Sequence, residues 1–180
     1  MLRRSLRIPI LLCCCLCCCA LPLLASQSQW QPRDKGMDFG SGNAHGEKQW
    51  VRMESPQDWT FSAGHPQVVV LNFQVDDGLH VNSHTPHSPY LIPTTLTLDA
   101  PAGVHVTEMQ YPPAKDSTFH SASKDTLSIY TGAFPIQIHM QAKPGVYSVQ
   151  GKLRYQACDN QMRICNPPRT LLFTLRVTAK

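Results

Sequence analysis

The sequence predicts an all-β protein built as a two-layer antiparallel β-sandwich. From about residue 50 onward, short runs of β-branched and aromatic residues recur, and Pro, Gly, Asn and Asp separate them. No helical period of comparable length appears, so the crossover helices that parallel strands need are missing. A chain of 180 residues fits one domain of this kind.

Alternating apolar and polar residues mark the strands that have one buried face. The clearest alternation runs through residues 68–75 and 134–140. Residues 149–155 and 171–177 alternate in the same way, and we expect them to be neighbouring antiparallel strands. Further strands are predicted at 94–98, 104–110 and 126–130, for a total of seven or eight, with turns at 76–78 and 143–145.

The N-terminus has the features of an export signal. Arg3, Arg4 and Arg7 precede an almost wholly apolar stretch at residues 8–24, and small residues follow it. We expect residues 1–25 to be a cleaved signal peptide, 26–49 a flexible polar lead-in, and 50–180 the folded domain. A membrane or lipid anchor is the alternative, and either reading makes the domain periplasmic or otherwise exported.

The cysteines divide into two groups. Six of the eight lie between residues 13 and 19, which leaves Cys158 and Cys165 beyond the signal. An exported destination is oxidising, so these two are expected to be paired. Their spacing permits a disulfide without deciding whether it is an inert staple or a redox-active pair. The staple would stabilise the fold by about 2.5 kcal/mol.

Other functional classes find little support in the sequence. Without the three signal arginines, thirteen basic residues face twelve acidic ones, and this balance implies no nucleic-acid partner. Beyond the signal, hydrolase motifs, phosphate loops and a Cys-x-x-Cys motif are missing, so no cofactor is expected. His80, His84 and His87 offer a possible copper or zinc site, but their polar, loop-like surroundings favour exposed histidines, and no metal is expected.

Two motifs around the cysteines resemble a known family. The segments Tyr-Gln-Ala-Cys at 155–158 and Cys-Asn-Pro-Pro at 165–168 are similar to the N-terminal module of the thiol:disulfide interchange protein DsbD, also called the disulfide bond corrector family. The resemblance extends from about residue 68 to the C-terminus and includes residues 75–80, 90–98 and 111–113. The interval between the two cysteines is slightly longer than is usual in that family.

The resemblance implies an immunoglobulin-like fold and a thiol-disulfide exchange activity, as a component of an oxidoreductase system. Cys158 and Cys165 match the redox cysteines of the family, which need no small-molecule cofactor. Thioredoxin-like periplasmic proteins would be the partners, and a separate membrane protein would donate the electrons. The alternative is an immunoglobulin-like binding or assembly module with a purely structural disulfide.

The family and the charges near the cysteines suggest residues that would act around the pair. A loop there caps the cysteines with an aromatic ring, and Phe119 stands where this cap is expected. Arg163 and Arg169 would favour a thiolate electrostatically, whereas Asp159 would oppose it. Because exposed charges are screened by salt, their effects on the thiolate are expected to be weak.

Overall fold

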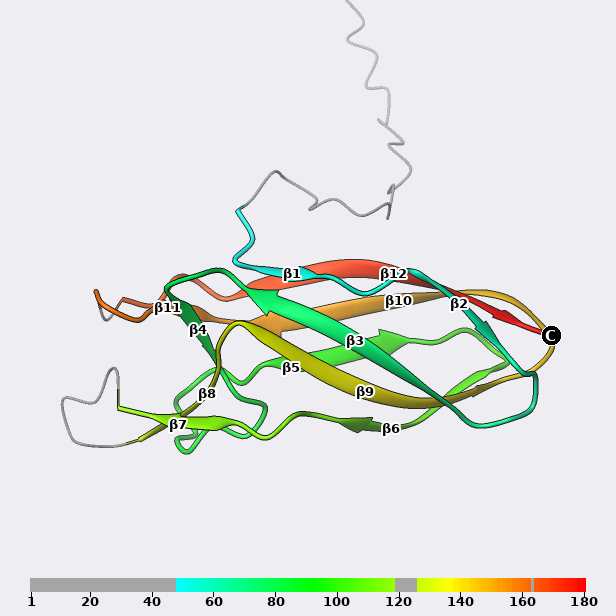
Figure 1. The fold of residues 1–180 in the computed structure, drawn as a ribbon, viewed down its shortest axis with the longest axis horizontal. Helices are drawn as coiled ribbons and strands as arrows, with labels where there is room; N and C mark the ends of the chain where they lie inside the picture. Colours follow the sequence, from blue (N-terminus) through cyan, green and yellow to red (C-terminus); the bar gives the residue numbers. More distant parts are fainter. Residues whose placement is uncertain (1–47, 119–125, 163) are drawn as a thin grey trace, which may run out of the picture. The chain divides into compact units, whose positions relative to one another are not determined.

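The computed structural model describes residues 48–118, 126–162 and 164–180, which contain strands and no helix (Figure 1). In chain order the strands are β1 Val51–Met53, β2 Asp58–Phe61, β3 Gln67–Val75, β4 Leu79–Asn82, β5 Thr95–Asp99, β6 Val104–Gln110, β7 Lys115–Ser117, β8 Leu127–Tyr130, β9 Ala133–Ala142, β10 Gly145–Tyr155, β11 Ala157–Asp159 and β12 Arg169–Ala179. The all-β class is confirmed, and every stretch predicted as a strand contains one.

The strands form three sheets of four strands each. Two sheets, in the orders β1-β3-β9-β6 and β2-β12-β10-β5, are the layers of the immunoglobulin-like sandwich. The third, in the order β11-β4-β8-β7, lies at one end of them (Figure 1, left), and we call it the end sheet. Among the described strands all pairs are antiparallel except β2 with β12. The strand count exceeds the predicted seven or eight because short strands give no readable alternation.

The core lies between the two long sheets. On β3, alternate residues from Val69 to Val75 are fully buried, as the alternation predicts. The ring of Phe73 stacks on Phe134 in its own sheet, with centroids 5.6 Å apart, and contacts Phe173 of the facing sheet at 5.9 Å. Full burial of one such side chain is worth about 1.5–3 kcal/mol. The sandwich is therefore held mainly by apolar contacts between its layers.

β10 and β12 form the longest ladder of the fold. Their pairing runs from Gly145 with Ala179 to Tyr155 with Arg169, which confirms the predicted neighbours. Gly151 lies opposite Phe173, and a Cβ at this position would fall 2.2 Å from the Phe173 ring. The glycine therefore makes room for a core aromatic ring. The ladder carries the chain directly into the cysteine segment, because β11 begins two residues after β10 ends.

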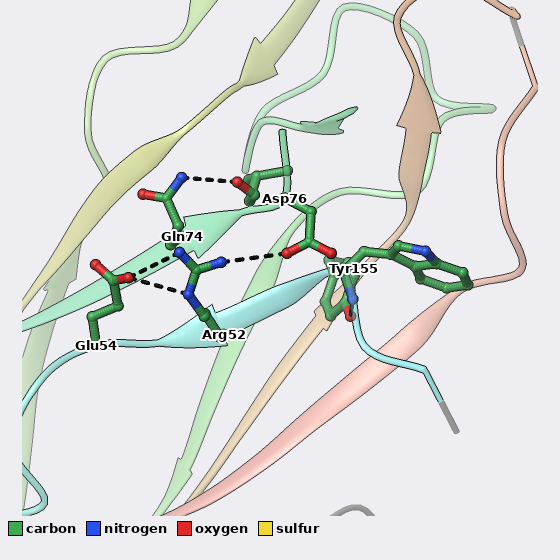
Figure 2. Close-up of polar contacts among 7 residues, drawn as sticks. Arg52, Glu54, Gln74, Asp76 and Tyr155 are labelled. Atoms are coloured by element: carbon green, nitrogen blue, oxygen red, sulfur yellow. Dashed lines mark hydrogen bonds and ion pairs between the residues drawn. The ribbon is translucent and has the colours of Figure 1, made fainter. Parts of the chain in front are cut away.

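The edge strand β1 is fastened where β3 ends. Arg52 Nε donates to Glu54 Oε1 at 3.2 Å and its Nη1 donates to Asp76 Oδ1 at 3.4 Å, as Figure 2 shows. The Tyr155 hydroxyl donates to Gln49 Oε1 at 2.6 Å and accepts from the Trp50 amide at 3.1 Å. Asp76 opens the turn into β4, in which Gly78 has a φ of 77°. The predicted turn at 76–78 is therefore present and anchored.

None of the described residues belongs to a helix with the length and apolar character needed to cross a bilayer.

Candidate functional site: the cysteine row of the end sheet

Cys158 and Cys165 form a disulfide, with Cα atoms 3.9 Å apart, and lie directly opposite each other in an antiparallel bridge. The Asp159 amide donates to the Ile164 carbonyl at 2.9 Å, and the Asn166 amide donates to the Ala157 carbonyl at 2.8 Å. These bonds flank the cysteines and make them a non-hydrogen-bonded pair, the position where facing residues come closest in an antiparallel ladder. The backbone itself therefore brings the two sulfurs together.

The two cysteines differ in their access to solvent. Cys158 is 2% exposed, whereas Cys165 is exposed. Met162 and Ile164, in the connection between them, are 67% and 58% exposed. An attacking thiolate must reach a sulfur, so access is one determinant of thiol-disulfide exchange. The arrangement offers Cys165 to an incoming group and keeps Cys158 inside.

The connection between the cysteines begins with a turn at residues 160–162. Asp159 Oδ1 accepts the amides of Gln161 and Met162, both at 2.7 Å, as Asp side chains commonly do in turns. The Asn160 amide donates to the Gly78 carbonyl at 2.9 Å and ties the connection to the turn before β4. These bonds hold residues 159–162 of the connection in place.

β11 pairs with β4, so Cys158 lies directly opposite His80. His80 is 1% exposed, and its Nδ1 lies 2.7 Å from Asn160 Oδ1. Opposite residues of a ladder share one face of the sheet. His80, Cys158 and Cys165 therefore form a row across three neighbouring backbone segments, which we call the cysteine row. The sequence predicts that His80 is an exposed loop histidine, and this prediction is wrong, because no local pattern gives the pairing of β4 with β11.

The other two histidines of the suggested metal site have separate surroundings. The His84 ring stacks on Tyr111, with centroids 3.7 Å apart and planes at 3°. His87 Nε2 lies 2.8 Å from Asp116 Oδ1 in an exposed pair. In the described part of the chain, no group of three or more His, Cys, Asp or Glu residues is arranged to hold a metal ion. A copper or zinc site at these three histidines therefore gains no support.

Hydrogen bonds connect the rest of the end sheet. The Ser83 and Ser128 hydroxyls lie 2.8 Å apart, and the Tyr130 hydroxyl donates to the Pro112 carbonyl at 3.2 Å and accepts from the His84 amide at 3.3 Å. Burial raises the pKa of Tyr130, and the bond from the His84 amide lowers it by less. The hydroxyl therefore stays protonated and can keep donating at neutral pH.

The remaining residues suggested from the sequence are only partly covered by the structure. Phe119 and Arg163 lie outside the described residues. The Arg169 guanidinium lies 5.4 Å from the centroid of the Trp50 ring, a cation–π contact. Asp159 supports the turn between the cysteines. Neither observation tests the electrostatic roles suggested for Arg169 and Asp159.

Comparison with known proteins identifies the family. Residues 47–177 match the family described as "Thiol:disulfide interchange protein DsbD, N-terminal", and no curated protein matches the chain. Among solved structures, the reduced DsbD N-terminal domain of Neisseria meningitidis is 12% identical, with 59% of this chain and 74% of that chain covered and a TM-score of 0.41.

Two further structures are similar at comparable identity. The N-terminal periplasmic domain of ScsB from Proteus mirabilis is 14% identical, with 68% of this chain and 44% of that chain covered and a TM-score of 0.43. The seventh PapD-like domain of human CEP192 is 13% identical, with coverages of 73% and 85% and a TM-score of 0.35. Because the sequence match spans well over half of the chain, this protein belongs to the family of DsbD N-terminal domains.

Proposed function

We propose that this protein is a thiol-disulfide exchange domain that passes reducing equivalents between redox proteins through Cys158 and Cys165. The observation that carries the proposal is the disulfide itself, in a chain of the DsbD N-terminal family, with one cysteine exposed and the other buried. A purely structural staple needs no access to either sulfur, whereas an exchange pair needs access to one.

The exchange follows from this asymmetry. A thiolate of the electron donor attacks the exposed Cys165 sulfur, the bond to Cys158 breaks, and Cys158 leaves with the electron pair and takes up a proton. The second thiolate of the donor then attacks the donor's other sulfur, which is bonded to Cys165 in the mixed disulfide, and releases Cys165 as a thiolate. The donor dithiol becomes a disulfide, and the pair becomes a dithiol. Reduction of an acceptor runs the same steps in reverse from Cys165.

Thioredoxin-like redox proteins are the partners that the family implies. We place the exchange in the periplasm, with residues 1–25 as a signal peptide, residues 50–180 as the working domain and a separate membrane protein as the electron donor. The exposed Met162 and Ile164 support docking beside Cys165, because apolar side chains at a surface favour contact with another protein.

Phe119 is our proposed cap for the pair, on the strength of its position in the family-like sequence. In the reduced protein, Phe119→Ala should speed alkylation of the cysteines by about tenfold, which corresponds to about 1.4 kcal/mol of lost shielding. His120→Ala, a change of the next residue, is the matched control. Equal alkylation rates in both variants would contradict a capping role.

The reduction potential of the pair tests the function. The protein is equilibrated in graded glutathione or dithiothreitol buffers, and free thiols are then alkylated and counted. A potential between about −180 and −270 mV is expected, the range of catalytic exchange couples. Resistance to reduction until the domain unfolds would overturn the proposal. It would favour an immunoglobulin-like binding module with a structural disulfide.

A further inference from the structure

The inner end of the cysteine row carries a titratable side chain. His80 lies opposite Cys158 in the β4–β11 ladder, and both residues are almost completely buried. Facing residues of antiparallel strands have Cβ atoms about 4.5–5.5 Å apart, within reach of an imidazole ring and a thiol. The sulfur that departs when the disulfide opens therefore has a proton-carrying group beside it.

The hydrogen bond to Asn160 determines which ring nitrogen of His80 can exchange a proton with Cys158. The Asn160 Oδ1 atom only accepts, so His80 Nδ1 must donate across the 2.7 Å contact. The lone pair of the neutral ring is then on Nε2, as when a second partner fixes the tautomer of a functional histidine. Asn160 is itself held by a hydrogen bond from its backbone amide to the Gly78 carbonyl. The residue that fixes the His80 tautomer therefore lies in the turn between the cysteines.

We propose that His80 is the proton-transfer residue of Cys158, giving a proton to the thiolate that leaves and taking it back when Cys158 attacks. The inference rests on the proposed exchange function and adds a residue to it. When a donor thiolate opens the disulfide, the electron pair of the broken bond stays on Cys158. A proton passes to this sulfur from the imidazolium Nε2–H, and the neutral ring later recovers a proton from water.

In the opposite direction the imidazole acts as the base. It removes the Cys158 proton, and the resulting thiolate attacks Cys165 in the mixed disulfide, releases the acceptor thiolate and restores the bond between the cysteines. A buried thiol needs such help, because an apolar environment disfavours the thiolate that must attack. Cys165 is exposed, so water can serve it directly.

Titratable and charged groups lie on the elements that flank β4. On β11, Cys158 lies opposite His80. Asp159 follows on the same strand, and its Oδ1 accepts hydrogen bonds from the Gln161 and Met162 amides. From β8, Tyr130 pairs with Val81 and therefore points to the other face of the sheet. Asp76 and Asp77 precede β4 in the turn, and Asp76 binds Arg52. Cys158 is the titratable group directly opposite the ring.

The first experiment measures the Cys158 thiolate without any exchange partner. In Cys165→Ser, Cys158 is the sole cysteine of the domain, and its ultraviolet thiolate absorbance is followed from about pH 5 to pH 9 against Cys158→Ser/Cys165→Ser. Coupling to an imidazole gives two inflections that belong to the pair. Adding His80→Gln should leave one inflection and lower the thiolate fraction at pH 7 by about tenfold. His84→Gln is the control, and its curve should match the parent.

The second experiment follows reduction of the intact disulfide by dithiothreitol as a function of pH. His80→Gln should slow it by about 100-fold at pH 7, the lower end of typical proton-transfer contributions. Asn160→Asp keeps the ring and places a carboxylate on Nδ1, which favours the imidazolium. The alkaline limb of its rate profile should therefore move to higher pH, which a merely structural histidine would not produce.

The outcomes separate this inference from the exchange function. Unchanged thiolate titration in His80→Gln, with an unchanged rate profile in Asn160→Asp, overturns the role of His80 even if the potential lies in the catalytic range. If His80→Gln does not fold, the shift in Asn160→Asp decides. A shifted titration in a protein whose disulfide resists reduction would support the His80–Cys158 coupling and overturn the exchange function alone.

Discussion

The two long sheets bury apolar side chains, whereas the end sheet and its adjoining loop bury polar side chains beside apolar ones such as Val81, Ile129 and Ala157. Between the long sheets the described buried residues are apolar. The buried polar residues of the described part all lie in β4, in β8 or in the loop between β4 and β5, and they are His80, Asn82, Ser83, Thr94 and Ser128. Apolar contacts have no preferred direction, whereas hydrogen bonds do. The sandwich therefore stabilises the fold, and the end sheet fixes the positions of the side chains beside the cysteines.

The polar contacts of the end sheet are closely linked. Thr94 Oγ1 donates to the Asn82 carbonyl at 2.6 Å, and Asn82 Nδ2 donates to the Ile92 carbonyl at 3.0 Å. Each such bond adds only about 0.5–1.5 kcal/mol net, but leaving a buried partner unpaired costs about 1–3 kcal/mol. Alternative arrangements of β4 are thus penalised, and His80 is held in line with the cysteines.

The largest effect on function is expected at the cysteines, with a smaller effect on stability. Cys165→Ser should abolish thiol-disulfide exchange with a thioredoxin-like protein, because the accessible sulfur is gone. Stability should fall by about 2.5 kcal/mol, since the disulfide closes only a short loop. Insulin-reduction or mixed-disulfide assays check the first effect, and urea unfolding checks the second. Residual exchange in Cys165→Ser would mean that the Cys158 thiolate can itself attack the disulfide of a partner.

A change in the core of the sandwich should lower stability and leave the reduction potential unchanged. Phe73→Ala removes a fully buried ring that contacts Phe134 and Phe173, and it should lower the free energy of unfolding by about 3–5 kcal/mol. The reduction potential of the folded variant should remain that of the parent. Val68→Ala, at a half-exposed position of the same strand, is the control. A large change in potential would show that the two regions are coupled.

The hydroxyl pair of the end sheet offers a sharper test of the comparison. Ser83→Ala or Ser128→Ala alone should cost about 1–3 kcal/mol, because each leaves the other buried hydroxyl without its 2.8 Å partner. The double variant should cost less than the sum of the two. Urea unfolding of the four proteins gives the coupling energy. Strict additivity would mean that the two hydroxyls do not stabilise each other.

The smallest effect concerns alkaline pH. Burial raises the pKa of Tyr155, and backbone bonds from Trp50 and Val51 lower it by less. A raised folded pKa makes its contribution fully present below the ordinary value of 10.0 and lost as pH rises through the folded value. Stability should fall above about pH 10, by at most about 1.4 kcal/mol per pH unit for one proton. Tyr155→Phe should flatten this fall in thermal unfolding, and an unchanged slope would contradict the assignment.

The same division explains what the sequence could predict. The long strands were recognised because a buried face repeats every second residue, and the predicted 104–110 matches β6. β4, β7 and β11 have three or four residues each, too few for an alternation to be read. The cysteine pair was evident from composition and motifs. From the sequence, His80 could be named only as a possible metal ligand. Its place opposite Cys158 could not be predicted, because this pairing joins residues 78 positions apart.

The hydrogen bonds that flank the cysteines have a consequence for the reduced protein. The bonds from Asp159 to Ile164 and from Asn166 to Ala157 join backbone groups, so cleavage of the disulfide does not remove them. Each thiol then remains beside the other at a high effective concentration, as for two reactants held within one molecule. Ring closure is correspondingly fast, and a mixed disulfide formed at Cys165 should have a short lifetime before Cys158 displaces the partner.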